Sequence, residues 1–176
     1  MRNIHLLVGN LTRTACGHSV WSIYPHESEA LDLSEIARSA AELYEPVAEE
    51  KGFVLSLATE TGVRIRGSRH LLSQALANLL DNALKYAGGG EIQIGVSHGD
   101  GRAVLEVADR GQGIPEADRE TVFNRFVRLE RSRSTPGNGL GLSLVRAVVR
   151  RHQGTIELVD NRPGLRIRLE FPELVT

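Results

Sequence analysis

The chain has 176 residues, of which 41 % are hydrophobic, and a formal net charge of -1. This length fits one domain with a substantial core, and the composition is ordinary for a soluble globular protein. The near-neutral charge argues against nucleic acid or a membrane surface as the main partner, and no apolar run approaches the roughly 20 residues of a membrane span. Cys16 is the only cysteine, which excludes an internal disulfide. We therefore expect a cytoplasmic chain with no nucleic-acid partner and no direct membrane contact.

The first 30 residues show no sustained hydrophobic period, so we interpret residues 1–30 as a remnant or linker and residues 31–176 as one domain. A helix is expected from Asp32 or Ser34, either of which could cap it, to about Lys51. Apolar residues recur along this segment at spacings of three and four, as an amphipathic helix requires: Ile36, Ala40, Leu43 and Val47.

Pro46 lies inside this first helix and should kink or break it. After Gly52 ends the helix, residues 53–58 should form a strand and residues 63–66 a short extended segment. A second helix should begin after a Ser68 cap and continue through Tyr86, before a run of three glycines.

Hairpins dominate the second half of the chain. Residues 91–97 and 102–108 alternate apolar and polar side chains around a His-Gly-Asp-Gly turn, and residues 155–159 and 165–171 should form the last strand pair. A third helix is expected over residues 139–152. This pattern predicts an α+β fold, a two-layer sandwich in which three helices cover one face of a mixed, mostly antiparallel sheet.

The first of three functional sequence blocks, NLLDNALKYA, occupies residues 78–87 of the second helix. Because each helical residue turns by about 100°, Asn78, Asn82 and Lys85 fall within roughly 60° of one another. An amide oxygen can ligate Mg²⁺, an amide can donate to phosphate, and a lysine adds positive charge. Taken alone, the block could equally be a solvated polar face. The opposite stripe is apolar and suits a core: Leu72, Leu76, Leu79, Leu80 and Ala83.

The second block, DRGQGI at residues 109–114, places a carboxylate at the end of a strand with buried neighbours. A carboxylate in such a position is costly unless it is paired, and Asp109, which has acceptors only, suits the exocyclic amine of adenine. Gly111 and Gly113 would let the backbone approach a flat ring without obstruction by Cβ atoms. The alternative is a simple strand-ending turn, because Asp and Gly are common in turns.

The third block, GNGLGLSL at residues 137–144, opens the third helix with Gly137, Gly139 and Gly141. Free backbone amides and the helix dipole make such a start an anion site. No Lys-Ser or Lys-Thr follows, and no strand precedes it, so the block is neither a Walker loop nor a dinucleotide fingerprint. A flexible hinge into the helix is the alternative.

A long polar stretch between the second and third blocks contains Phe123 and Phe126, which can anchor a loop to the core. Loops of this length are usually functional or disordered, and we expect a mobile lid over a nucleotide. Arginines in the stretch can reach phosphate as rigid forks, although a solvated basic loop remains open for the last two. These residues are Arg125, Arg128, Arg131 and Arg133.

From about Leu31 to Phe171 the chain resembles the catalytic, ATP-binding domain of bacterial sensor histidine kinases, part of the GHKL superfamily. NLLDNALKYA is similar to the N box, DRGQG to the first glycine box, VFNRF to the F box and GNGLGL to the second glycine box. Gly154-Thr155 matches a weaker, later glycine position. The resemblance implies a Bergerat-type α/β sandwich with a mobile ATP lid, and ATP and Mg²⁺ as cofactors.

The resemblance also implies roles for individual residues. Asn82 would be the main Mg²⁺ ligand with Asn78 assisting, and Asp109 would accept from the adenine amine. Lys85 would contact phosphate, and Arg128 would contact the γ-phosphate. The implied catalytic set is thus Asn78, Lys85 and Arg128. The remaining implied nucleotide contacts are Tyr86, Gly111, Gly113 and Ile114 around the base, Gly137, Gly139, Leu140, Gly141 and Leu142 around the phosphates, and Thr155.

One position bears on the type of reaction. Hydrolytic members of the superfamily carry a glutamate where this chain has Asn78, and an amide cannot take a proton from water. We therefore expect donation of the γ-phosphoryl group to a histidine on a separate or missing dimerisation domain, for relay to an aspartate of a response regulator. Whether the parent kinase is membrane-anchored is left open by this resemblance.

The chain departs from complete sensor kinases in lacking an obvious phosphoacceptor. His26-Glu27 is the only histidine followed by an acid, and it lies next to Pro25 with no helix around it, so we do not expect it to be the acceptor. Two alternatives stay open, a stand-alone serine kinase of the anti-sigma type and a nucleotide-dependent binding module without transfer activity. The other histidines are expected at the surface or at helix ends: His5, His18, His70, His98 and His152.

Overall fold

The computed structural model describes residues 28–127 and 139–174, so residues 1–27 of the predicted linker and residues 128–136 of the long polar stretch predicted as a lid lie outside the described residues. The described elements are β1 (Glu29–Asp32), α1 (Leu33–Glu50), β2 (Phe53–Thr59), β3 (Arg64–Gly67), α2 (Arg69–Tyr86), β4 (Gly90–Gly99), β5 (Arg102–Ala108), the 3₁₀ turns η3 (Glu116–Asp118) and η4 (Thr121–Phe123), α3 (Gly141–Arg151), β6 (Thr155–Asp160) and β7 (Leu165–Pro172).

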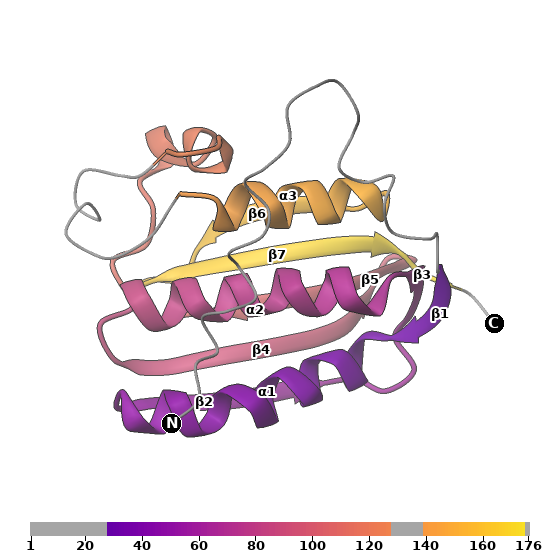
Figure 1. Ribbon diagram of the computed structural model, residues 1–176, viewed down its shortest axis with the longest axis horizontal. Helices are drawn as coiled ribbons and strands as arrows, with labels where there is room; N and C mark the ends of the chain where they lie inside the picture. The colour runs from indigo at the N-terminus through magenta and orange to yellow at the C-terminus, as the bar shows by residue number, and fades with distance from the viewer. Residues whose placement is uncertain (1–27, 128–138, 175–176) are drawn as a thin grey trace, which may run out of the picture.

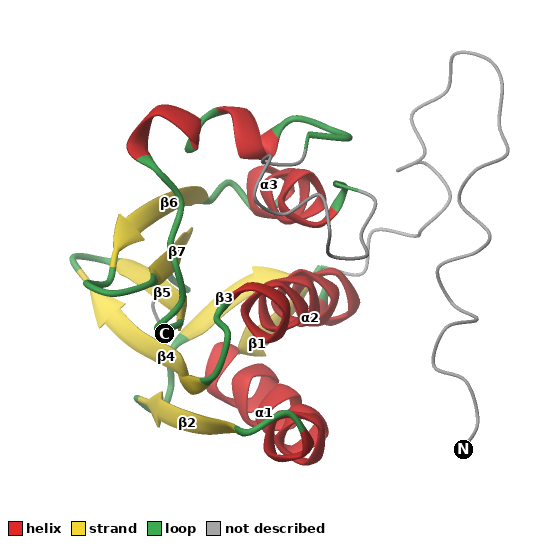
Figure 2. Cartoon of the chain, turned by 90° about the vertical axis from the view of Figure 1, so that its left-hand side faces the viewer, coloured by secondary structure: helices red, strands yellow, loops and turns green. Residues whose placement is uncertain are grey.

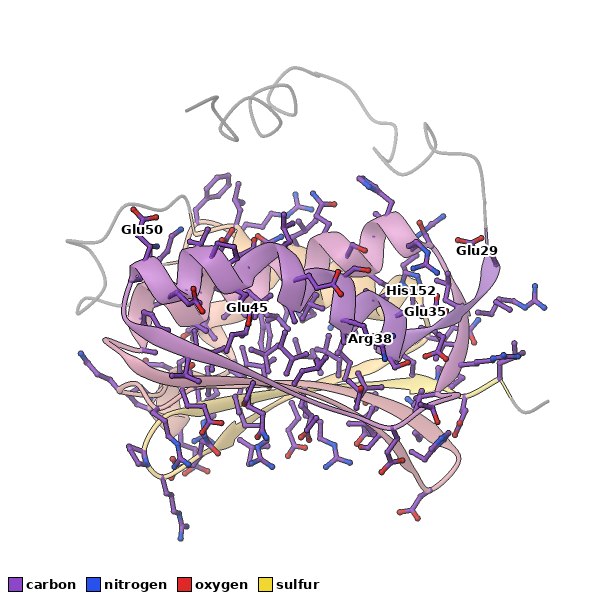
Figure 3. The ribbon with its side chains drawn as sticks, turned by 90° about the horizontal axis from the view of Figure 1, so that it is seen from below. Glu29, Glu35, Arg38, Glu45, Glu50 and His152 are labelled. Carbon is purple, nitrogen blue, oxygen red and sulfur yellow. The ribbon has the colours of Figure 1, made fainter. Side chains whose placement is uncertain are left out.

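The fold has two layers. A five-stranded sheet of order β2-β4-β5-β7-β6 forms one layer, and α1, α2 and α3 lie side by side against one of its faces (Figures 1 and 2). Only β2 and β4 pair in parallel, while the other neighbours are antiparallel. Side chains fill the space between the helical layer and the sheet (Figure 3). The predicted α+β sandwich with a mixed, mostly antiparallel sheet is confirmed.

The short strand β1 was not expected from the sequence. It pairs with β3 in a separate two-stranded antiparallel sheet, where Leu31 lies opposite Ile65 and both side chains are buried. Four residues carry too little periodic signal to be recognised as a strand, so only the pairing with β3 reveals it.

Helix α1 begins as predicted at an Asp32 cap, whose Oδ1 accepts hydrogen bonds from the backbone and hydroxyl of Ser34. The helix continues through Pro46 to Glu50, so of the two predicted effects of this proline, a kink or a break, the break does not occur. The predicted apolar face is partly confirmed, because Ile36 is buried and Ala40 packs against the core, whereas Leu43 is 68 % exposed and Val47 is 38 % exposed. The other buried apolar residues of α1 are Leu33, Ala37 and Ala48.

Helix α2 is the central helix and buries its predicted apolar stripe. Its first turn is joined to the end of α3 by His152, an 8 % exposed residue that was expected at a helix end or at the surface. His152 does follow α3, but its ring is buried, where Nε2 accepts from the Ser68 backbone at 3.0 Å and Nδ1 donates to the Val148 carbonyl at 2.7 Å. A Cβ on Gly67 would collide with this ring. Neutral His152 therefore connects the two helices that flank the site described below.

We predict that His152 makes stability dependent on pH. Burial lowers the pKa of His152 below its ordinary value of 6.5, so the unfolded chain takes up the proton first on acidification. The contribution of His152 is therefore complete above pH 6.5 and is lost as the pH falls below it. Removing both hydrogen bonds in His152→Phe should cost about 1–3 kcal/mol near neutral pH, and urea unfolding should show this penalty shrinking towards pH 5.

His98 provides a control, because its contribution to stability should change with pH in the opposite direction. Its hydrogen bond with Glu173 raises its pKa, so its contribution is present below pH 6.5 and is lost as the pH rises through the raised value. The penalty for His98→Gln should thus grow, not shrink, on acidification. A His152→Phe penalty that is independent of pH would contradict a buried neutral histidine.

Candidate functional site

The site is centred on Asp109, the residue that follows β5. Its Oδ1 accepts from the backbone of Gly111 at 2.8 Å and of Leu165 at 3.3 Å. Its main chain is fixed as well, because its N–H donates to the Leu165 carbonyl at 2.9 Å and its carbonyl accepts from Asn161 Nδ2 at 2.8 Å. The end of β5, the start of β7 and the turn between β6 and β7 therefore set the orientation of one carboxylate.

The two oxygens of that carboxylate differ in their surroundings. Asp109 is half-buried, and burial raises its pKa while the two backbone hydrogen bonds oppose the rise. Both of these hydrogen bonds end on Oδ1, and no described residue donates a hydrogen bond to Oδ2. An acceptor at a half-buried position without a protein donor suits a ligand that brings an N–H group.

The glycines after Asp109 have a packing role in the protein itself. A Cβ on Gly111 would lie 2.6 Å from Ala87 Cα at the end of α2. Gly113 has a φ of +69°, and its Cβ would lie 2.9 Å from the Gly164 carbonyl. A Cβ on Gly164 would in turn collide with the Asp109 carbonyl. These glycines allow the segment after β5 to pack between α2 and the β6–β7 turn, and their proximity to an adenine ring stays a prediction.

The amides predicted from the first block face the start of α3. Asn78 Nδ2 donates to the Gln74 carbonyl at 2.8 Å, which leaves its Oδ1 as the outward group. A Cβ added to Gly141, the first residue of α3, would lie 3.5 Å from Asn78 Oδ1 and from both Nδ2 and Oδ1 of Asn82. The structure thus brings the first and third blocks together, and the amide oxygens are of the type that binds Mg²⁺.

No side chain caps α3 among the described residues, so the backbone amides of its first turn point towards this gap without a capping partner. Leu140 occupies the N-cap position and is 38 % exposed, whereas Leu142 packs partly against the core. Gly139 has a φ of +64°, and its carbonyl accepts from the Phe126 backbone at 2.9 Å. The residues on either side of segment 128–138 therefore meet beside the helix start.

Most of the other predicted site residues lie at the end of α2, after Gly113 or outside the described residues. Lys85 and Tyr86 are exposed at the end of α2, Tyr86 with its carbonyl close to Gly111, and Ile114 packs partly against the core. Arg128 and Gly137 lie outside the described residues.

Thr155 is not brought to the site. It begins β6 opposite Glu170, whereas Asp109 contacts Leu165, five residues earlier on β7, or about 16 Å away along the strand. The Gly-Thr pair was the weakest of the motif matches. The residues that hold Asp109 are instead Asn161, Gly164 and Leu165, which the sequence indicated only as a turn and a strand start. An Asn-Arg-Pro-Gly turn gives no sign by itself of which strand end it will contact.

Comparison with known proteins gives the class to which this geometry belongs. Residues 67–175 match the family model described as "Histidine kinase-, DNA gyrase B-, and HSP90-like ATPase". The chain is 37 % identical over 149 residues to the sensor-like histidine kinase SenX3 of Mycolicibacterium smegmatis, covering 82 % of this chain and 39 % of that protein. It is 36 % identical over 163 residues to the signal transduction histidine-protein kinase/phosphatase MprB of Mycolicibacterium vanbaalenii, covering 90 % and 32 %.

Solved structures give the same result. A mycobacterial MprB sensor histidine kinase superposes with a TM-score of 0.74 at 29 % identity, covering 85 % of this chain and 99 % of that one. Full-length ShkA in complex with AMPPNP superposes with a TM-score of 0.77 at 28 % identity, covering 87 % and 32 %.

The chain belongs to the histidine kinase-, DNA gyrase B- and HSP90-like ATPase family. Within this family it is an ATP-binding catalytic domain of the sensor histidine kinase type. It spans about a third to two-fifths of the length of the curated relatives it matches. Within residues 28–127 and 139–174, no helix has the length and apolar character needed to cross a membrane.

The space between α2 and α3 can be tested with one methyl group. In Gly141→Ala the new Cβ meets its neighbours at an ordinary contact distance of 3.5 Å, so the fold should tolerate it. The methyl nevertheless occupies the gap between the two amides and the helix start. We predict an unchanged melting temperature and an affinity for Mg-ATP analogues lower by about tenfold, measured by calorimetry.

Gly164→Ala is the contrasting variant. Because its Cβ collides with the Asp109 carbonyl at a φ of +111°, it should lose about 2 kcal/mol or more of stability. Undiminished nucleotide affinity in a folded Gly141→Ala protein would exclude the gap from the binding site.

Proposed function

We propose that the chain binds Mg-ATP between Asp109, the amides of α2 and the start of α3, and donates the γ-phosphoryl group to a histidine on a separate dimerisation domain. The observation that carries the proposal is the carboxylate of Asp109, which keeps one oxygen for a donor from outside the described protein. The family supports ATP as the ligand, and the relative ShkA was solved with AMPPNP. The transfer to histidine is inferred from the named relatives.

Each part of the site would act on a different part of the nucleotide. Asp109 would accept from the exocyclic amine of adenine, and Gly111, Gly113 and Ile114 would lie near the base. The amide oxygens of Asn82 and Asn78 would hold Mg²⁺, which when bound neutralises phosphate charge. Lys85 and the first-turn amides of α3 would hold phosphate oxygens. Catalysis would then consist of positioning and charge stabilisation.

The side chain of Asn78 bears on what receives the phosphoryl group. Its amide nitrogen already donates to the Gln74 carbonyl, and its oxygen cannot take a proton from water at neutral pH. The helix face next to the proposed phosphates therefore offers no general base for hydrolysis at this position. A histidine supplied by another domain brings its own nucleophilic nitrogen, and a response regulator aspartate would receive the group afterwards.

Asp109→Asn tests the proposed contact with adenine. The amide oxygen can keep the hydrogen bonds from Gly111 and Leu165, which places the NH₂ group where Oδ2 was. A donor would then face the donor of adenine, and affinity for an ATP analogue should fall by about tenfold or more. Thermal stability should be preserved, because a half-buried charge has been removed. Asp100→Asn in the β4–β5 turn is the matched control, and equal affinities of both variants and wild type would refute the contact.

A labelling experiment tests the transfer. Incubated with ATP labelled at the γ-phosphate, the chain alone should remain unlabelled. Addition of the dimerisation domain of a sensor kinase relative should give an acid-labile phosphoprotein on that domain. An acid-labile label on the chain itself would locate the acceptor within it, an acid-stable label on a serine would favour a kinase of the anti-sigma type, and binding without any transfer would favour a binding module.

A further inference from the structure

A groove of about 430 Å³ lies between η4 and α3, outside the proposed nucleotide site. Its α3 wall is made of Ser143, Arg146, Ala147 and Arg150. At about 100° per residue, these four positions centre on the side of α3 opposite Gly141, which faces the amides of α2. Figure 2 shows η4 beside α3 on the side away from α2. The groove and the nucleotide site therefore use different faces of one helix.

Arginines dominate the groove. Arg125 enters from the segment after η4, while Arg146 and Arg150 lie one turn apart on α3. No acidic side chain of the described residues lines it. The side chains of Arg125 and Arg150 are exposed, and neither guanidinium forms a hydrogen bond or ion pair with another described residue. Because the whole chain carries a net charge of only -1, this positive charge is a local concentration and not a general property of the surface.

Arg146 lines the groove and also joins its two walls. Its guanidinium lies 5.0 Å from the centroid of the Phe123 ring, and its Nη2 donates to the Phe123 carbonyl at 3.3 Å. These contacts fix η4 against α3 and leave the other N–H groups of Arg146 unused by them. The other two residues of the α3 wall, Ser143 and Ala147, have small side chains that leave room in the groove.

The shape and chemistry favour one kind of occupant. Guanidinium forks bind carboxylates in bidentate fashion, and arginines on two walls can hold more than one carboxylate. The α3 wall extends from residue 143 to residue 150, about 10 Å along the helix, which is more than a single small anion covers. We infer that this groove is a docking surface for an acidic segment of a partner protein, in which Arg125 and Arg150 bind carboxylates and Arg146 positions the two walls.

The inference does not depend on the proposed phosphoryl transfer, because the groove is separate from the nucleotide site. The probe is a fluorescein-labelled peptide of alternating Glu and Ala, with the corresponding Gln-Ala peptide for comparison, followed by fluorescence anisotropy at low and high salt. The test variant is the double substitution Arg125→Gln with Arg150→Gln, which leaves the structural Arg146 in place. The control is Arg38→Gln with Arg66→Gln, which removes the same charge from exposed positions on α1 (Figure 3) and β3.

We expect the Glu-Ala peptide to bind the wild-type chain, the Gln-Ala peptide not to bind, and the groove variant to lose about tenfold in affinity. The control variant should lose less than about twofold, and both variants should keep the wild-type melting temperature. Equal losses in the two variants would show that the effect comes from net charge alone and would overturn the inference. Absence of peptide binding to wild type would overturn it as well.

Discussion

The site depends on a difference in hydrogen bonding between the two carboxylate oxygens of Asp109. Backbone N–H groups from its own turn and from the start of β7 bind Oδ1, while no described residue donates to Oδ2. Such an arrangement requires three chain segments to approach within hydrogen-bonding distance, and glycines at positions 111, 113 and 164 make the approach possible. The same contacts that stabilise the end of β5 therefore orient one acceptor for a ligand.

Packing of α2 in the core determines where the amide side chains of the site point. Helix α2 lies between α1 and α3 and buries Leu72, Leu76, Leu79 and Leu80, so its rotation about its own axis is fixed by apolar packing. With that rotation fixed, Asn78 and Asn82 can only face the start of α3. At the other end, His152 joins the end of α3 to the residue that caps α2. A core mutation that rotates α2 should therefore move the amides of the site, even when the mutated residue makes no contact with them.

The sequence predicted the layers, the five strands of the main sheet and the three helices, because periodicity and glycine placement are local signals. Only the family resemblance, which assigned Asn78, Asn82 and Gly141 to one nucleotide, implied that these residues lie near one another. The sequence predicted the buried side of α1 only in part, since Ile36 and Ala40 contact the core while Leu43 and Val47 satisfy the same helical period without being buried. Pro46 does not break α1, which continues through it to Glu50. The sequence could not indicate that Asn161 and Leu165 form hydrogen bonds with Asp109. These two residues lie more than 50 positions away in sequence, in a hairpin whose register is determined by the sheet.

The proposed function requires Oδ2 of Asp109 to accept a hydrogen bond from the amine of an adenine nucleotide. Calorimetric titration of the unmodified chain with non-hydrolysable triphosphates of adenosine and of inosine, both with Mg²⁺, measures the worth of this hydrogen bond. Inosine carries a carbonyl in place of the amine, so an acceptor would face an acceptor. The adenosine compound should bind at least about tenfold more tightly. Equal affinities for the two compounds would show that Asp109 does not bind the amine.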